Sequence, residues 1–217
     1  MPKPGDFYVG VVELFAVLLP GALLMAALLL TLVPLVPAPF DGRVSVQAQW
    51  VAFAFGAYAL GAFVFPVASL IDDRYYNPYR ERRWPKADDH AYAWATDLRQ
   101  RYFHQPQAAR DDIPMNTFAW AKAVLMLHAP GAFNDVQRFE AESKFFRSLV
   151  VVLPVVGGLA MIQGVLDGAP GLVVGAPIVA LVLARLSFHR YAERRHKSTE
   201  WAYRYLVTLK FGSEPGG

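Results

Sequence analysis

Residues 149–188 read LVVVLPVVGGLAMIQGVLDGAPGLVVGAPIVALVLARLSF. This stretch holds two apolar runs, Leu149 to Leu166 and Leu172 to Phe188, in which Arg185 is the one charged residue. A helix needs roughly 20 apolar residues to cross a bilayer core of about 30 Å. Only a short turn at residues 167–170 (DGAP) separates the runs. The stretch therefore predicts an antiparallel pair of membrane helices.

Two further apolar stretches precede it. One runs from Leu14 to about Val36 and the other from about Trp50 to Ile71, where Asp72 and Asp73 follow. Neither contains a charged residue, and the whole chain is 55% hydrophobic, which is high for a soluble domain. We predict an all-α membrane protein with four transmembrane helices and a helical cytoplasmic domain formed by the loop between helices 2 and 3 and the C-terminal tail.

The flanking charges predict the orientation, because Lys and Arg near membrane ends are retained in the cytoplasm. The connection from Pro37 to Gln49 carries only Arg43, and the turn at 167–170 carries none. The loop after Ile71 and the tail after Phe188 are rich in both residues. We therefore expect a multi-pass inner-membrane protein whose long loop and two termini are cytoplasmic.

The long loop is expected to fold, because it is rich in Tyr, Trp and Phe. Asp88 or Asp89 can cap a helix that ends near Phe103, and Asn116 or Thr117 can cap a second that stops at Pro130. Asn134 can cap a third that runs unbroken into the third span. The fourth span is expected to continue from Arg185 to Lys210. Expected packing residues are Tyr92, Trp94, Leu98, Tyr102, Leu186, Tyr191, Trp201, Tyr205 and Leu209.

This pattern divides the chain into five parts. They are an N-terminal cytoplasmic or interfacial segment (1–13), transmembrane helices 1 and 2 (14–71), a cytoplasmic helical domain (72–146), transmembrane helices 3 and 4 (147–188) and a cytoplasmic helical tail (189–217).

Basic and aromatic residues gather in two clusters beside the spans. Guanidinium groups next to aromatic faces suit the phosphates and bases of a nucleotide or a single-stranded nucleic acid. Anionic lipid contact explains the same clusters, as is usual for basic segments beside a membrane. The candidate ligand-binding residues are Arg80, Arg82, Arg83, Trp84, Lys86, Arg190, Arg194, Arg195, Lys197 and Trp201.

The N-terminal segment and the start of the first span carry the candidate pore or gate residues. An ionisable group at membrane depth is a functional candidate, and Glu13 lies where the chain enters the bilayer. An interfacial position of Glu13 is the alternative. The segment from Gly5 to Pro20 is interpreted as an entry helix that plugs or lines a pore. The candidates are Phe7, Val11, Glu13, Phe15 and Pro20.

Small residues spaced four apart let helix backbones approach closely, within one chain or between chains. They occur as Ala52 with Gly56, Ala57 with Gly61, and Ala160 with Gly164.

Signs of catalysis are few. The chain has no cysteine, which excludes thiolate metal sites and cysteine nucleophiles, and no nucleotide-binding, hydrolase or zinc-protease motif. Asp72 and Asp73 resemble the magnesium-binding acids of lipid-phosphate enzymes, but matching acidic residues are missing. We expect no catalytic residue, no metal and no cofactor.

Two stretches carry a family resemblance: Asp6 to Gly21 (DFYVGVVELFAVLLPG) and Arg138 to Arg147 (RFEAESKFFR). They resemble the membrane effectors of bacterial antiphage systems, such as the channel-like effector of Hailong-type defence. The resemblance implies an oligomeric channel controlled by a nucleotide or oligonucleotide signal, with a nucleotidyltransferase as its partner.

The leading functional prediction is a homo-oligomeric ion channel or pore-forming effector of antiviral defence that contacts membrane lipids and senses a cytoplasmic ligand. The runner-up is a membrane-anchored scaffold or accessory subunit that docks a soluble partner. A lipid-modifying enzyme comes third.

Overall fold

The computed structural model describes residues 4–32, 45–85, 89–103 and 115–212, and this part of the chain contains no strand. Side chains in the first helix are described at Leu14 and from Ala16 onward. The elements are α1 (Pro4–Leu32), α2 (Val46–Ile71), the π-helical turn η2 (Asp72–Tyr76), α3 (Asn77–Arg83), α4 (His90–Tyr102), α5 (Thr117–His128), α6 (Pro130–Leu166) and α7 (Pro170–Gly212). The predicted all-α class is confirmed.

Three of the described helices are long and apolar enough to cross a membrane: α2 with its continuation to Arg83, α6 and α7. The described apolar part of α1 is shorter and covers Ala16–Leu32. Large apolar side chains such as Val174, Ile178 and Leu181 point away from the protein on α7. Such a surface is compatible with a membrane protein, in which lipid rather than water would cover these side chains.

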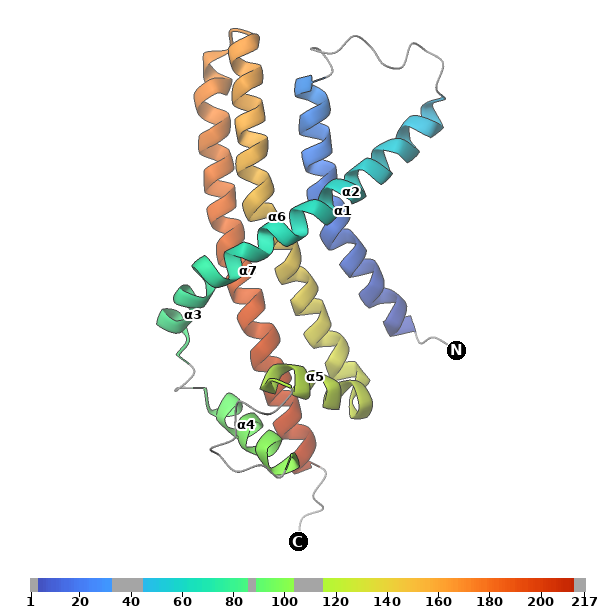
Figure 1. Ribbon diagram of the computed structural model, residues 1–217, viewed down its shortest axis with the longest axis vertical. Helices are drawn as coiled ribbons and strands as arrows, with labels where there is room; N and C mark the ends of the chain where they lie inside the picture. The colour runs from blue at the N-terminus through green and yellow to red at the C-terminus, as the bar shows by residue number, and fades with distance from the viewer. Residues whose placement is uncertain (1–3, 33–44, 86–88, 104–114, 213–217) are drawn as a thin grey trace.

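The hairpin of α6 and α7 is the longest unit of the fold and confirms the predicted antiparallel pair (Figure 1). Its turn is a Schellman motif, in which the Ala169 N–H donates to the Gly164 carbonyl at 2.8 Å. Gly168 has a φ of +66°, which favours glycine. Below the apolar runs both helices continue without a break, as predicted. However, α6 begins at Pro130 rather than near Asn134, because proline is well suited to the first turn of a helix.

Helix α2 crosses α1 obliquely, and the two backbones meet at glycines (Figure 1). A Cβ atom on Gly21 would collide with the Ala57 carbonyl, and one on Gly61 would collide with the Val17 carbonyl. Ala57 is fully buried at this crossing, which confirms that the pair Ala57 and Gly61 mediates a helix contact, here within one chain.

The other two small-residue pairs differ in their surroundings. Gly164 is buried against α7 beside Val173, whereas Ala52 is exposed. Gly56 lies next to the Met25 side chain.

The helical stretch that begins with α2 continues past Asp72, where a helix end was expected. The chain passes through the π-helical turn η2 and continues as α3 to Arg83. The Asn77 N–H donates to the Asp72 carbonyl, five residues earlier. Charge at residues 72 and 73 ends the apolar run, but the helix continues because charged residues are compatible with helical geometry outside hydrocarbon.

At the end of the molecule opposite the α6–α7 turn, α4 and α5 pack against the continuation of α7 (Figure 1). Asp89 and Asn116 cap these helices through their side chains, which confirms both predicted starts. The core contains Ala95, Trp120, Leu125, Val136, Ala202 and Leu206, and Tyr92, Leu98, Trp201 and Tyr205 pack around it. Tyr191 is buried in a second core, whereas Trp94, Tyr102 and Leu186 are exposed, contrary to expectation.

Candidate functional site

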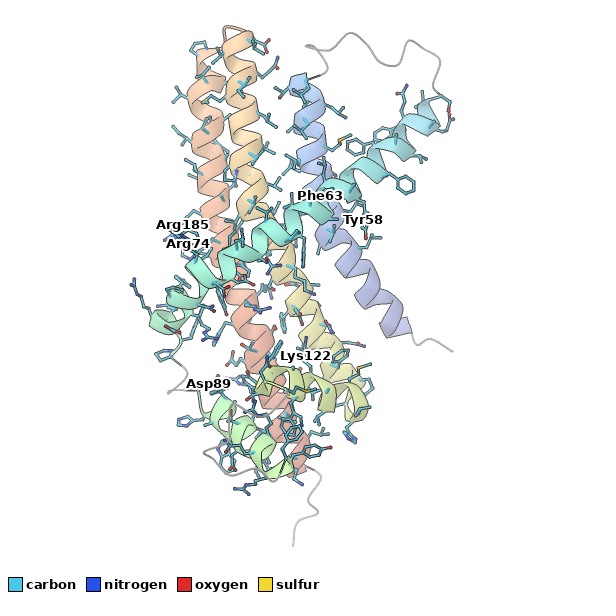
Figure 2. All side chains as sticks on the ribbon, viewed as in Figure 1. Tyr58, Phe63, Arg74, Asp89, Lys122 and Arg185 are labelled. Carbon is cyan, nitrogen blue, oxygen red and sulfur yellow. The ribbon has the colours of Figure 1, made fainter. Side chains whose placement is uncertain are left out.

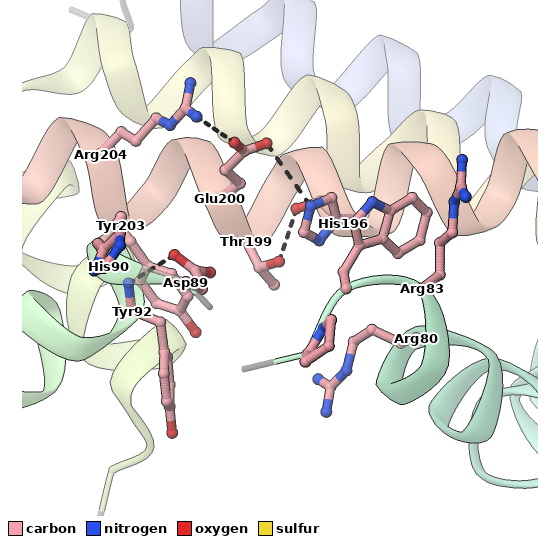
Figure 3. Close-up of a pocket in the computed structure, with 13 residues that line it drawn as sticks. Arg80, Arg83, Asp89, His90, Tyr92, His196, Thr199, Glu200, Tyr203 and Arg204 are labelled. Carbon is pink, nitrogen blue, oxygen red and sulfur yellow. Dashed lines mark hydrogen bonds and ion pairs between the residues drawn. The ribbon is translucent and has the colours of Figure 1, made fainter. Parts of the chain in front are cut away.

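A cavity of about 550 Å³ lies where the end of α3, the start of α4 and the continuation of α7 come together (Figure 3). This is within the usual volume range of small-molecule sites. It is lined by Arg80, Arg83, Trp84, Pro85, Asp89, His90, Ala91, Tyr92, His196, Thr199, Glu200, Tyr203 and Arg204. We call it the α3–α7 pocket.

The α3 wall of the pocket carries cations at a helix C-terminus. Arg80 and Arg83 lie in the last turn of α3, where the helix dipole favours positive charge. Trp84 ends the helix, and its N–H donates to the Arg80 carbonyl at 2.7 Å. Within the described parts of the chain, neither arginine makes an ion pair, and the Arg80 Nε atom is buried without a hydrogen-bond partner. These guanidinium groups are available to an anion.

The α7 wall carries polar residues on one helical face. His196, Glu200 and Arg204 are spaced four apart, which aligns them along the helix. The Glu200 carboxylate accepts from Arg204 at 2.5 Å and lies 3.9 Å from the His196 ring. The Thr199 hydroxyl donates to the His196 carbonyl at 2.8 Å. Glu200 thus orients two basic groups toward one cavity.

Aromatic rings join the walls. Trp84 stacks on the His196 ring with 4.3 Å between ring centroids and an interplanar angle of 6°, which ties α3 to α7. Tyr92 packs on Tyr203 at 5.5 Å and ties α4 to α7. Asp89 accepts the Tyr92 N–H at 3.0 Å and so sets the start of α4. The pocket is therefore built where α3 and α4, which are close in the sequence, meet the distant helix α7.

The electrostatics of the pocket favour a ligand with both anionic and neutral polar parts. Arg80, Arg83 and Arg204 face two carboxylates, Asp89 and Glu200. Arg204 is paired with Glu200, which leaves the two guanidinium groups of Arg80 and Arg83 and the one carboxylate of Asp89, a net positive charge. Phosphate oxygens suit these guanidinium groups, and the carboxylates can accept hydrogen bonds from hydroxyl or amino groups.

Burial also affects the ionisable side chains of the α7 wall. Desolvation lowers the pKa of His196 below its ordinary value, against the opposing charge of Glu200. Burial raises the pKa of Tyr203, which keeps its hydroxyl protonated and able to donate. Among the described residues, no group of three or more His, Asp or Glu side chains could hold a metal.

Only part of the predicted ligand set lines the pocket. Arg80, Arg83 and Trp84 do, and Arg82 is exposed on the same helix without lining it. Lys86 lies outside the described residues. The structure thus brings three of the five residues of the first cluster to one cavity.

The second predicted cluster lies on α7 but faces other partners. Arg190 and Lys197 both pair with Glu193, at 3.1 and 2.9 Å. Arg194 pairs with Glu142 at 3.0 Å and lies over the Phe139 ring. Trp201 packs on Tyr205, and Arg195 does not line the pocket. The α7 residues in the pocket are His196, Thr199, Glu200, Tyr203 and Arg204, and the spacing of four between His196, Glu200 and Arg204 could have revealed them.

The pore candidates lie in α1. Phe7, Val11, Glu13 and Phe15 are helical, and their side chains are outside the described part. Pro20 is fully buried within its own chain, beside the crossing with α2.

A second polar cluster lies at the level where the apolar runs end, near Arg74 and Arg185 in Figure 2. One carboxylate oxygen of Asp72 accepts from Arg147 Nη1 of α6 at 2.7 Å. The other accepts from the Tyr191 hydroxyl of α7. Asp73 faces solvent and accepts from Asn77 at 3.2 Å. Asp72 therefore joins η2 to both helices of the hairpin.

The chain is thus an all-helical protein whose long apolar helices are compatible with a membrane, with a polar pocket on the continuations of those helices. Comparison with protein-family models, curated proteins and solved structures found no match.

Proposed function

We propose that the chain is an oligomeric membrane ion channel or pore-forming effector controlled by a nucleotide or oligonucleotide bound in the α3–α7 pocket, acting in antiphage defence. The observation that carries this proposal is the position of the pocket. Its walls belong to α3 and α7, which continue two apolar helices, so a ligand that bridges Arg80 and Arg204 acts on both.

The chemistry of the pocket supports a nucleotide as the ligand class. The unpaired guanidinium groups of Arg80 and Arg83 suit phosphates, and Trp84 and Tyr92 provide aromatic surface for a base. The carboxylates of Asp89 and Glu200 can accept from sugar hydroxyl or base amino groups. A lipid headgroup would supply the phosphate without the base.

In this proposal α1, α2, α6 and α7 all span the inner membrane, with both termini and the pocket in the cytoplasm and lipid around the apolar faces. Four short spans enclose little space, so the ion path lies on the axis of a homo-oligomer. The candidate gate residues of α1 would line that axis. Gating then means that the ligand changes the position of α3 relative to α7 and thereby moves the attached membrane helices.

The test is ion flux from liposomes that contain the purified chain, with ATP and a short single-stranded oligonucleotide as probes. We expect flux that at least one probe changes. Arg80→Ala should abolish the response, because it removes an unpaired pocket cation. Arg82→Ala is the matched control, because it removes a cation from the same helix outside the pocket. Absence of flux in every condition would refute the channel function. Equal responses of the two variants would refute the α3–α7 pocket as the ligand-binding site.

A specific observation favours the scaffold as a second candidate. Trp94 of α4 and Phe211 in the last turn of α7 form an aromatic pair that is half exposed, at 50% and 48%. Such a surface suits a soluble protein partner, such as a nucleotidyltransferase. Trp94→Ala should weaken co-purification of that partner without changing flux. The Asp72 contacts with Arg147 and Tyr191 support a structural rather than a catalytic role for this acid.

A further inference from the structure

Asp72 is the one acidic residue that contacts both helices of the hairpin from outside it, among the contacts of the described chain. Its partners are 75 and 119 residues away in the sequence. Both are buried, since the Arg147 side chain is 8% exposed and Tyr191 is 1% exposed. A single carboxylate thus holds η2 against α6 and α7.

The π-helical turn sets the direction in which α3 faces. A π turn contains one residue more than an α-helical turn, so it rotates everything after it by about 100° relative to an uninterrupted α-helix. Arg80 and Trp84 follow this turn within 12 residues of Asp72. The side of α3 that faces α7, and therefore the wall of the pocket, depends on η2.

Breaking the Asp72 contact is strongly unfavourable in this setting. Arg147 lies over the Phe65 ring at 4.9 Å, and its Nε atom is buried without a hydrogen-bond partner. Without Asp72 it would be an uncompensated buried charge. Tyr76 of η2 also packs on Tyr191, at 5.2 Å between ring centroids. Both the charge of Arg147 and the ring of Tyr191 therefore favour the formed contact.

We infer that Asp72 is a positioning residue that locks α3, and with it the Arg80 and Trp84 wall of the pocket, in register with α6 and α7. A ligand that displaces α3 must strain or break the contact with Arg147 and Tyr191, and this transmits occupancy of the pocket to the membrane helices. The transmission rests on the proposed function, whereas the positioning role does not.

The test measures the distance between α3 and α7 directly. The chain has no cysteine, so two spin labels can be attached at Glu81→Cys and Leu186→Cys, both exposed and outside the pocket. In the otherwise unchanged protein we expect one narrow distance distribution. Asp72→Asn should broaden or shift it, because a neutral amide no longer compensates Arg147.

Asp73→Asn is the matched control, since it makes the same change one residue away on a side chain that faces solvent. It should leave the distribution narrow. If Asp72→Asn and Asp73→Asn give the same distribution, the inference is wrong. Where Asp72→Asn does not give folded protein, Tyr191→Phe decides, because it removes one hydroxyl and keeps the ring. Broadening then supports the lock and an unchanged distribution overturns it.

Flux separates this inference from the proposed function. In liposomes, Asp72→Asn should lose the response to the probes that Asp73→Asn retains. If no variant conducts ions, the channel proposal fails, while the distance distributions still decide the role of Asp72.

Discussion

At the scale of single residues, a cation next to a helix C-terminus without a carboxylate partner is ready to hold an anion, and Arg80 and Arg83 are such cations in the described chain. The contrast with α7 is informative. Arg190, Arg194 and Lys197 are equally basic in sequence, yet each pairs with a glutamate. Their partners reduce their value as ligand-binding groups.

His196 makes the stability of the protein depend on pH. Its pKa is lowered from 6.5 in the folded state, with burial as the largest cause. The facing carboxylates of Glu200 and Asp89 oppose this lowering of the pKa. The facing guanidinium groups of Arg80 and Arg204 reinforce it. As the pH falls below 6.5, the unfolded chain takes up the proton first. Stability is therefore fully present above this pH and decreases below it.

We predict that His196→Gln flattens this acid-induced loss of stability. Because one proton is involved, the slopes of unfolding free energy against pH for the parent and the variant differ by at most about 1.4 kcal/mol per pH unit. Thermal unfolding in detergent between pH 8 and pH 5 measures it. His189→Gln is the control, because His189 is exposed and outside the pocket. Parallel curves for the parent and His196→Gln would contradict the prediction.

At the scale of elements, the contact between α1 and α2 depends on the absence of side chains at two positions. Gly21 and Gly61 each face a backbone carbonyl of the other helix. A backbone cannot move aside as a flexible side chain can, so an added methyl group has to separate the helices.

We predict that Gly61→Ala destabilises the protein by about 2 kcal/mol, as overpacking typically does. Unfolding in a denaturing-detergent titration measures this loss. Gly158→Ala is the matched control, because a Cβ on Gly158 in α6 meets nothing within 4 Å. Equal stabilities of the two variants would show that the crossing is not a tight contact.

Some features of the helices could be predicted from neighbouring residues and others could not. The caps at Asp89 and Asn116 and the unbroken runs of α6 and α7 were predictable, because capping and continuity depend on neighbouring residues. The π-helical turn was not predictable, because the residues around Asp72 look the same as those at a helix end. Where the helix continues past Asp72, this residue contacts Arg147 and Tyr191, which are far away in the sequence.

At the scale of the whole molecule, the α6–α7 turn and the α4–α5 region lie at opposite ends of the long axis (Figure 1). In the proposed orientation, with four spans and both termini in the cytoplasm, the turn at Asp167 would be outside the cell and α5 inside. A hydrocarbon layer around the apolar faces would then separate these two ends.

We predict that a cysteine at the exposed position Asp167 reacts with an impermeant maleimide on intact cells, whereas one at Met126 on α5 reacts only after permeabilisation. The absence of native cysteine makes each label specific. The reverse pattern would invert the topology, and reaction at both positions would refute a sealed membrane position for this chain.

The helical class, the hairpin, the caps and the apolar segments could all be predicted from the amino-acid sequence, because each depends on hydrophobic runs and on residues within a turn of one another. Which charged residues meet could be seen only in the folded chain. It joined Arg80 and Trp84 to His196 and Arg204, and Asp72 to Arg147 and Tyr191. The reason is physical: contacts between distant helices depend on their crossing and rotation, which the packing of the entire chain sets.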